Sequence, residues 1–170
     1  RRWFDDILFE CTHRTGPQEN GQAMISAMAR KINEAQISRE NLEFYAGMYS
    51  LPKTLKNERI EEMIHMAGLS GRENELTANL SGGWKQRLAL GCSILHRPTI
   101  LFLDEPTGGV DPKSRRMFWD IIYDLSAGGT TVMVTTHFMD EAEHCDEIGF
   151  IFEGKLIASD TPSRLKQAIP

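Results

Sequence analysis

Two short apolar runs constrain the fold of this chain more than any other feature. Residues 100–103 (Ile-Leu-Phe-Leu) and 131–134 (Thr-Val-Met-Val) are continuous, and each is followed by a polar turn and a helix-like segment. Runs of this kind are typical of parallel strands that are buried on both faces. Asp111-Pro112 opens the intervening helix with a capping residue and a proline at the first helical position. We therefore predict a strand, a helix and a parallel strand in the second half of the chain.

The segments on either side of this unit have different periodicities. Between residues 38 and 70, apolar side chains recur at helical spacing, which predicts two amphipathic helices. A third helix is expected over residues 82–96, with Ser81 as its cap. The apolar run at 148–152 precedes Glu153-Gly154 and a second short run, which is typical of a hairpin.

The order of these elements predicts an α/β fold with a helical insert. The 170 residues are enough for one domain that buries roughly 70% of its unfolded surface. We expect four parts, namely an N-terminal remnant of unassigned structure, a helical subdomain, an α/β core and a C-terminal helix. Their expected bounds are residues 1–37, 38–80, 81–160 and 161–170.

Composition excludes several classes of protein. A formal charge of −5 without a basic stripe gives no reason to expect a nucleic-acid partner. Three widely spaced cysteines suggest neither a disulfide framework nor a zinc site, and they fit a reducing, cytoplasmic setting. The longest apolar runs fall far short of the roughly 20 residues that cross a bilayer, so any membrane association is expected to be peripheral.

The first motif is Leu-Ser-Gly-Gly-Trp-Lys-Gln-Arg at residues 80–87. Two glycines after a serine at the start of a helix expose backbone N–H groups beside the positive end of the helix dipole, which suits a phosphate. Ser-Gly-Gly is also common as a simple helix cap. Taken alone, this motif leaves both interpretations open.

The second motif is the apolar run at 100–103 followed by Asp104 and Glu105. A carboxylate at a strand end can hold Mg²⁺, often through water, and a second carboxylate can orient or deprotonate the attacking water in phosphoryl transfer. The next apolar run leads to His137. Taken singly, a simple acidic strand end remains an alternative for the two carboxylates, and a lone histidine after a strand is more often structural than catalytic.

Together these elements resemble the ATP-binding-cassette (ABC) ATPase family over about residues 38–160. The resemblance identifies residues 80–87 as the signature motif and 103–106 as the Walker B strand with its catalytic glutamate. It identifies residues 109–111 as the D-loop and His137 as the switch histidine. It implies a partial P-loop NTPase fold, with a mostly parallel sheet and a helical subdomain.

Two positions depart from the commoner family pattern. Trp84 stands where a polar residue is often found, and Gly108-Gly109 stands in place of Ser-Gly or Ser-Ala. Both departures look like variation within exporter-type ATPase subunits, which the segment 38–51 also resembles.

The resemblance implies ATP and Mg²⁺ as cofactors. Asp104 would hold the metal ion, Glu105 would position water and His137 would contact the γ-phosphate. Family members pair head to tail, so the signature motif of each cassette completes a site built on the phosphate loop of the other. The residues implied in that contact are Ser81, Gly82, Gly83 and Gln86, with Asp111 in the D-loop.

The family holds its own nucleotide with the phosphate loop G-x-x-x-x-G-K-S/T, which does not occur in these residues. The nearest segment has Gly16 and Gly21 at the right spacing, but Gln22 occupies the lysine position and Ala23 the hydroxyl position. A degenerate loop and a chance spacing remain alternatives. We expect a defective ATP site and no ATP turnover by the isolated chain, whether through decay or truncation.

The expected partners are a second cassette and a transmembrane permease subunit at the cytoplasmic face of the membrane. One alternative is a non-catalytic scaffold or regulatory subunit that completes the ATP site of a partner. Another is a soluble cassette ATPase of repair or translation, which the exporter-like segment 38–51 disfavours.

Overall fold

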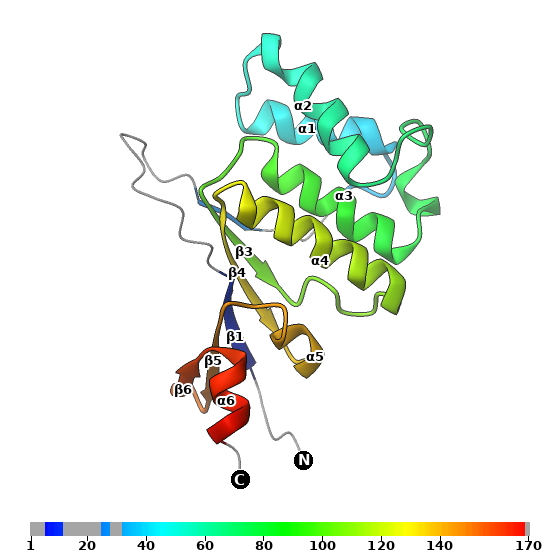
Figure 1. Cartoon of the computed structure of the whole chain (residues 1–170). Helices are drawn as coiled ribbons and strands as arrows, with labels where there is room; N and C mark the ends of the chain where they lie inside the picture. The colour runs from blue at the N-terminus through cyan, green and yellow to red at the C-terminus, as the bar shows by residue number, and fades with distance from the viewer. Residues whose placement is uncertain (1–5, 12–24, 28–31, 169–170) are drawn as a thin grey trace. The chain divides into compact units, whose positions relative to one another are not determined.

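The computed structural model describes residues 6–11, 25–27 and 32–168 (Figure 1). The segment containing Gly16, Gly21 and Gln22 lies outside the described residues. The strands are β1 (Asp6–Cys11), β2 (Ile25–Ala27), β3 (Ile100–Asp104), β4 (Thr131–Thr136), β5 (Glu147–Phe152) and β6 (Lys155–Asp160). The helices are α1 (Ser38–Met48), α2 (Lys53–Met66), the 3₁₀ helix η1 (Thr77–Asn79), α3 (Gly82–Ile94), α4 (Pro112–Ala127), α5 (Met139–Ala142) and α6 (Pro162–Ala168).

The strands form one sheet in the order β2-β3-β4-β1-β5-β6 (Figure 1). The predicted parallel pair is confirmed, because β3 and β4 pair in parallel. The expectation of a mostly parallel sheet is corrected, because the other described pairings, β1 with β4, β1 with β5 and β5 with β6, are antiparallel. β1 runs opposite to both of its neighbours and separates them. The apolar pattern of a run does not record its direction, so the sequence could not predict this insertion.

The hairpin between β5 and β6 is confirmed. Its two loop residues, Glu153 and Gly154, have φ angles of 48° and 72°. Positive φ at both central residues is the mark of the type I′ turn, whose twist matches that of the flanking strands.

Burial along β3 and β4 differs from the expectation that both faces of the strands are buried. Leu101, Leu103, Val132 and Val134 are at most 1% exposed, whereas Phe102 is 39% exposed. Successive side chains of a strand point to opposite faces, so this alternation means that only one face is fully buried. Continuous apolar sequence therefore overstated the burial of these strands.

The structure divides into two compact units. Unit 1 comprises residues 1–25, 99–106 and 122–170, and unit 2 comprises residues 26–98 and 107–121. This division does not follow the expected boundary at residue 81, because α3 packs with α1 and α2 in unit 2. Most of α3 is buried, and its residues 88–92 are apolar or glycine. A Cβ at Gly91 would lie 3.4 Å from Met63 Cβ and 3.8 Å from Leu42 Cδ2, so this glycine lets the three helices approach closely.

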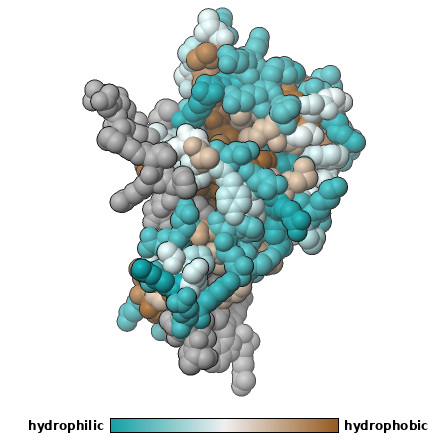
Figure 2. All heavy atoms as spheres, in the orientation of Figure 1, coloured by the Kyte–Doolittle hydropathy of each residue, from teal (hydrophilic) through white to brown (hydrophobic). Residues whose placement is uncertain are grey.

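Hydrophilic residues cover most of the face seen in Figure 2, with apolar surface scattered among them. Two of the exposed apolar side chains, Phe44 and Met48, lie one turn apart on α1 and are 61% and 55% exposed. Tyr45 and Tyr49 are half-buried, and the Tyr49 ring stacks on His96 at a centroid distance of 4.0 Å. In the part of the chain that the structure describes, no helix has the length and apolar character needed to span a membrane.

Candidate functional site

The predicted acidic residues and the predicted histidine meet in unit 1. Asp104 ends β3, Glu105 follows it, and His137 follows the end of β4. Since β3 and β4 are parallel neighbours, their carboxyl ends lie at the same edge of the sheet. His137 Nδ1 lies 3.1 Å from Glu105 Oε1, and both side chains are about half exposed, at 53% and 54%. The structure thus brings these two residues into hydrogen-bonding contact at the surface.

Thr135 holds this edge together, and sequence reasoning did not single it out. Its Oγ1 donates a hydrogen bond of 2.8 Å to Asp104 Oδ1, and its carbonyl accepts one of 2.9 Å from the Glu105 N–H. Thr135 lies opposite Asp104 in the parallel pair, so a correct alignment of the two apolar runs would have pointed to it. We call Asp104, Glu105, Thr135 and His137 the strand-end cluster.

Glu105 adopts a backbone conformation that is rare for its residue type. Its φ angle is 45°, in the left-handed region that costs a non-glycine residue on the order of 1 kcal/mol or more. The hydrogen bond from its N–H to Thr135 fixes the turn immediately after the strand. Strain of this kind concentrates at functional sites, where it aims a particular side chain.

The donor set at this edge suits a magnesium ion rather than a metal held entirely by protein. Asp104 offers an exposed carboxylate at the tip of β3, already oriented by Thr135. No group of three or more His, Cys, Asp or Glu residues among those described could hold a metal ion. Mg²⁺ usually takes one or two carboxylates and completes its octahedron with water and phosphate oxygens. Asp104 therefore fits the metal that the sequence predicted.

The signature turn, residues 80–83, lies at the start of α3 in unit 2. Leu80 is buried, whereas Ser81 and Gly82 are exposed. Ser81 occupies the N-cap position with extended backbone angles, but its side chain makes no capping hydrogen bond. The prediction of Ser81 as the cap residue of this helix is therefore confirmed by its position, although its hydroxyl group makes no capping hydrogen bond. Gln86 is half-buried on the second turn of α3.

Residues 109–111, which the resemblance identifies as the D-loop, lead into α4. Gly109 has a φ angle of 72°, which favours glycine. Asp111 Oδ1 accepts a 3.0 Å hydrogen bond from the Ser114 N–H, so the predicted capping of α4 by Asp111 is confirmed. Hydrogen bonds from Ser114 hold the pKa of the Asp111 carboxyl below its ordinary value.

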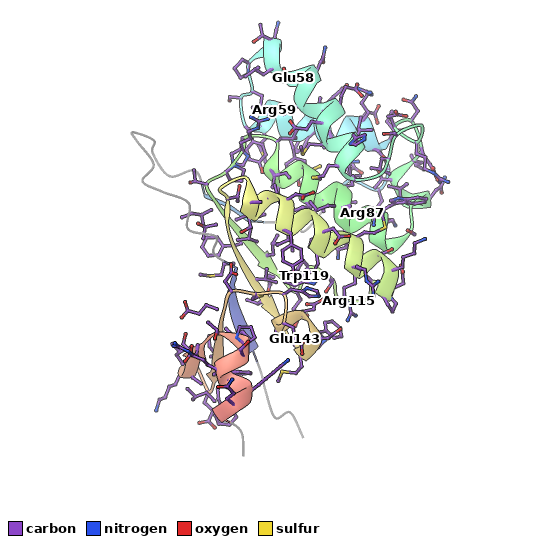
Figure 3. The ribbon with its side chains drawn as sticks, in the orientation of Figure 1. Glu58, Arg59, Arg87, Arg115, Trp119 and Glu143 are labelled. Atoms are coloured by element: carbon purple, nitrogen blue, oxygen red, sulfur yellow. The ribbon has the colours of Figure 1, made fainter. Side chains whose placement is uncertain are left out.

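Two further residues of α3 contribute to this region. Arg87 is only 4% exposed, and its Nε donates a 2.9 Å hydrogen bond to the Ala67 carbonyl at the end of α2 (Figure 3). Burial lowers the pKa of Arg87, and the Asp111 carboxylate acts in the opposite direction. Trp84, the departure from the family pattern, has the Arg72 guanidinium 4.3 Å from its ring centroid, a cation–π contact. Sequence reasoning assigned no role to Arg87, although its position inside a motif was a signal.

The predicted site residues therefore fall into two groups. Asp104, Glu105 and His137 lie together in unit 1, while the signature turn and Asp111 lie in unit 2. Each group is ordered by contacts within its own unit.

Known proteins resemble this chain over most of its length. A family profile described as "ABC transporter" matches residues 9–108, more than half of the chain. The probable multidrug ABC transporter ATP-binding protein YbhF of Escherichia coli K12 is 55% identical over 127 residues, which is 75% of this chain and 22% of that protein. The linearmycin resistance ATP-binding protein LnrL of Bacillus subtilis is 39% identical, over 74% of this chain and 41% of that protein.

Two further comparisons agree with these matches. The daunorubicin/doxorubicin resistance ATP-binding protein DrrA of Streptomyces peucetius is 36% identical over 85% of this chain and 44% of that protein. The chain thus spans less than half the length of each of these relatives. A solved structure of an ATP-binding subunit of an ABC transporter shares the fold, with a TM-score of 0.71 and 23% identity over 85% of this chain and 61% of that one. The chain therefore belongs to the ABC transporter family and corresponds to the ATP-binding domain of such a transporter.

Proposed function

We propose that the signature turn of this chain completes the ATP site of a partner cassette, and that the strand-end cluster is the hydrolytic set of the chain's own site. The observation that carries the proposal is the 3.1 Å contact between Glu105 and His137, beside an Asp104 carboxylate oriented by Thr135. A carboxylate at a metal position, a second carboxylate and a histidine at one exposed edge are the groups that phosphoryl transfer to water requires.

Each residue of the cluster has a distinct role in this proposal. Glu105 orients the attacking water and accepts its proton, because its carboxylate is exposed and aimed by a fixed turn. His137 holds Glu105 in place and donates a hydrogen bond to the γ-phosphate. Asp104 would hold Mg²⁺, which supplies positive charge to the phosphates when it is bound. Thr135 keeps the Asp104 carboxylate in one orientation.

In unit 2 the exposed start of α3 faces outward. Ser81 and Gly82 offer a hydroxyl group and backbone N–H groups at the positive end of a 13-residue helix, which suits the phosphates of a nucleotide bound to another cassette. Gly83 and Gln86 belong to the same proposed contact. Asp111 belongs to the D-loop that accompanies it.

We also propose that the assembly is an exporter. The relatives described above include a probable multidrug transporter protein and two drug-resistance proteins. The chain would bind a second cassette and a permease, and so lie peripherally at the cytoplasmic face of the membrane. The exposed Phe44 and Met48 on α1 supply apolar area for the permease contact.

The test uses a complete cassette of the family whose own signature serine has been replaced by arginine, so that pairs of that cassette do not close on ATP. Labelled ATP is titrated onto this chain, onto the disabled cassette and onto their mixture. We expect no ATP turnover by the isolated chain, and tight ATP binding only in the mixture. Ser81→Arg in this chain should abolish that gain.

The outcomes separate the two functions that the sequence left open. ATP hydrolysis in the mixture that Glu105→Gln in this chain abolishes supports a catalytic role for this chain. Hydrolysis that survives Glu105→Gln takes place at the partner's site, as expected of a non-catalytic scaffold or regulatory subunit. If the mixture binds ATP no better than the disabled cassette alone, the proposed contact in trans is wrong. Turnover by the isolated chain that Glu105→Gln abolishes would contradict a defective ATP site.

A further inference from the structure

The second glycine of the signature turn lies against the first turn of α4. A Cβ built on Gly83 would lie 2.4 Å from both Cβ and Oγ of Ser114, and 3.6 Å from Val110 Cγ1. A Cβ contact below 3.0 Å essentially never occurs in proteins, so only glycine fits at this position. Gly82, its neighbour, has no atom within 4 Å of an added Cβ. The two glycines of one motif therefore meet different constraints.

Space, and not backbone freedom, is what position 83 demands. Gly83 lies in α3, and its φ angle is not in the left-handed region, so alanine would suit its backbone. The obstacle is the Cβ of Ser114, which the backbone of α4 fixes and no side-chain rotation can move. A loss of stability in Gly83→Ala would therefore come from the contact with Ser114 and not from the helical backbone.

Ser114 is itself tied to the D-loop. Its N–H donates to Asp111 Oδ1 at 3.0 Å, and Val110, which also contacts the Gly83 position, is buried in the same loop. The start of α3, which carries the signature turn, thus meets the start of α4, which follows the D-loop. We call this contact of Gly83 with Ser114 and Val110 the joint. A displacement of Ser114 would be passed directly to Asp111.

Arg87 supports the same joint from one turn further along α3. Residues four apart lie on the same face of a helix, so Gly83 and Arg87 share a face. Arg87 bonds the Ala67 carbonyl through Nε, and its buried Nη1 has no hydrogen-bond partner among the described residues. The Asp111 carboxylate is close enough to favour the charged guanidinium. Gly83 therefore connects this face of α3 to the D-loop through Ser114 and Val110, and Arg87 connects it through the charge of Asp111.

We propose that Gly83 is a positioning residue that locks the D-loop to the signature turn, so that both are presented to the partner's nucleotide as one body. The joint itself is a property of this chain, whereas its service to a partner's nucleotide rests on the proposed function. The proposal separates the role of Gly83 from that of Gly82, which faces outward without such a contact.

The first experiment measures the joint in the full chain without nucleotide. Gly83→Ala should lower the thermal midpoint by roughly 5 °C, as overpacking does, and speed amide exchange at Ser114. Ser114→Gly removes the obstructing Cβ but keeps the N–H that donates to Asp111. In that background, Gly83→Ala should lower the thermal midpoint only slightly. Ser114→Ala keeps the Cβ and should not rescue. Gly82→Ala is the matched control and should leave both readouts unchanged.

The second experiment measures ATP binding in the mixture with the disabled cassette. Gly83→Ala should weaken that binding at least tenfold, and Ser114→Gly should restore most of it, because the joint and not the phosphate contact was damaged. A role confined to stability would change the thermal midpoint without changing ATP affinity in the folded mixture. That result would overturn the positioning role.

Failure of this inference is distinguishable from failure of the proposed function. If the unaltered chain does not improve ATP binding in the mixture, the function in trans fails, while the thermal midpoint and the Ser114 amide still decide the joint. If Gly83→Ala behaves like Gly82→Ala, the joint does not exist. If Gly83→Ala lowers the thermal midpoint and weakens ATP binding as much in the Ser114→Gly background as in the unaltered chain, the contact assigned to Ser114 is also refuted.

Discussion

The strand-end cluster and the joint between the signature turn and the D-loop are organised in opposite ways. In the cluster, Glu105 and His137 are about half exposed and interact through the ends of their side chains. In the joint, Gly83 is buried and its role depends on a side chain that is absent. The first region presents chemical groups to solvent, whereas the second fixes backbone positions.

The difference decides what a substitution should reveal in each region. Contacts between exposed polar side chains contribute roughly 0–1 kcal/mol to the free energy of unfolding, so substitutions in the strand-end cluster should change chemistry much more than stability. Buried contacts at close approach tolerate few changes, so the joint couples position to stability. Four predictions follow this contrast from the largest expected effect to the smallest.

The largest effect is expected from Glu105→Gln on catalysis. In a version of the chain fused to the phosphate-loop segment of a complete cassette, this change should lower ATP turnover by about 10²- to 10⁴-fold, since general-base catalysis is lost. The free energy of unfolding should hardly change. Turnover assays and urea denaturation on the same preparation measure both. A fall of less than tenfold would remove Glu105 from the proposed role.

Arg87→Ala should produce the largest loss of stability among these changes. It empties a buried position and leaves the Ala67 carbonyl without its donor, with an expected cost of about 3 kcal/mol in the free energy of unfolding. Arg116→Ala, at an exposed position of α4, is the control and should cost less than about 0.5 kcal/mol. Equal urea midpoints for the two variants would show that Arg87 does not support the joint.

Asp111 should make the joint sensitive to acid. Its folded pKa lies below the ordinary value, so its contribution to stability is present above about pH 4 and is lost as pH falls through the lowered pKa. Asp111→Asn keeps a good capping residue but does not titrate, and should therefore lose less stability between about pH 5 and pH 2. Urea midpoints at stepped pH test this, with Asp120→Asn on the same helix as the charge control. If the urea midpoints of the unaltered chain and of Asp111→Asn fall equally between about pH 5 and pH 2, Asp111 is not the source of the acid sensitivity.

The smallest effect is expected from His137→Ala on stability. The side chain is 53% exposed and its hydrogen-bond partner Glu105 is 54% exposed, so the free energy of unfolding should change by less than about 0.5 kcal/mol. Urea denaturation measures it. A loss above about 1.5 kcal/mol would mean that the cluster is a structural element, and the contrast with the joint would collapse.

Much of the fold was predictable from local pattern. The helices within residues 38–70, the helix after Ser81, the parallel pair β3–β4 and the hairpin at Glu153-Gly154 are all present. Each depends on periodicity, proline or turn residues that act within a few positions along the chain. The direction of β1 was not predictable because it depends on which strands lie alongside it, and the exposure of Phe102 was not predictable because it depends on what packs over that face of the sheet.

The site divides in the same way. Asp104, Glu105 and His137 were identified by residue type and by their place after two apolar runs, and parallel pairing then brought Glu105 and His137 into contact. Thr135 was missed because its contribution depends on register between strands that are distant in sequence. Ser81 was predicted as the cap of α3 and is its N-cap residue, but its side chain makes no capping hydrogen bond, which the sequence could not show.

The sequence by itself determined the family to which the chain belongs and the types of most of its elements, and it supplied the residues proposed to carry its chemistry, because these depend on residue identity and short spacing. The tertiary structure alone decided that Thr135 orients Asp104, that Arg87 is buried against the end of α2 and that Gly83 meets Ser114. The physical reason is that these contacts join residues between 20 and 31 positions apart, or depend on space left empty by a glycine. A motif names such a glycine, but only packing shows what the missing side chain would have struck.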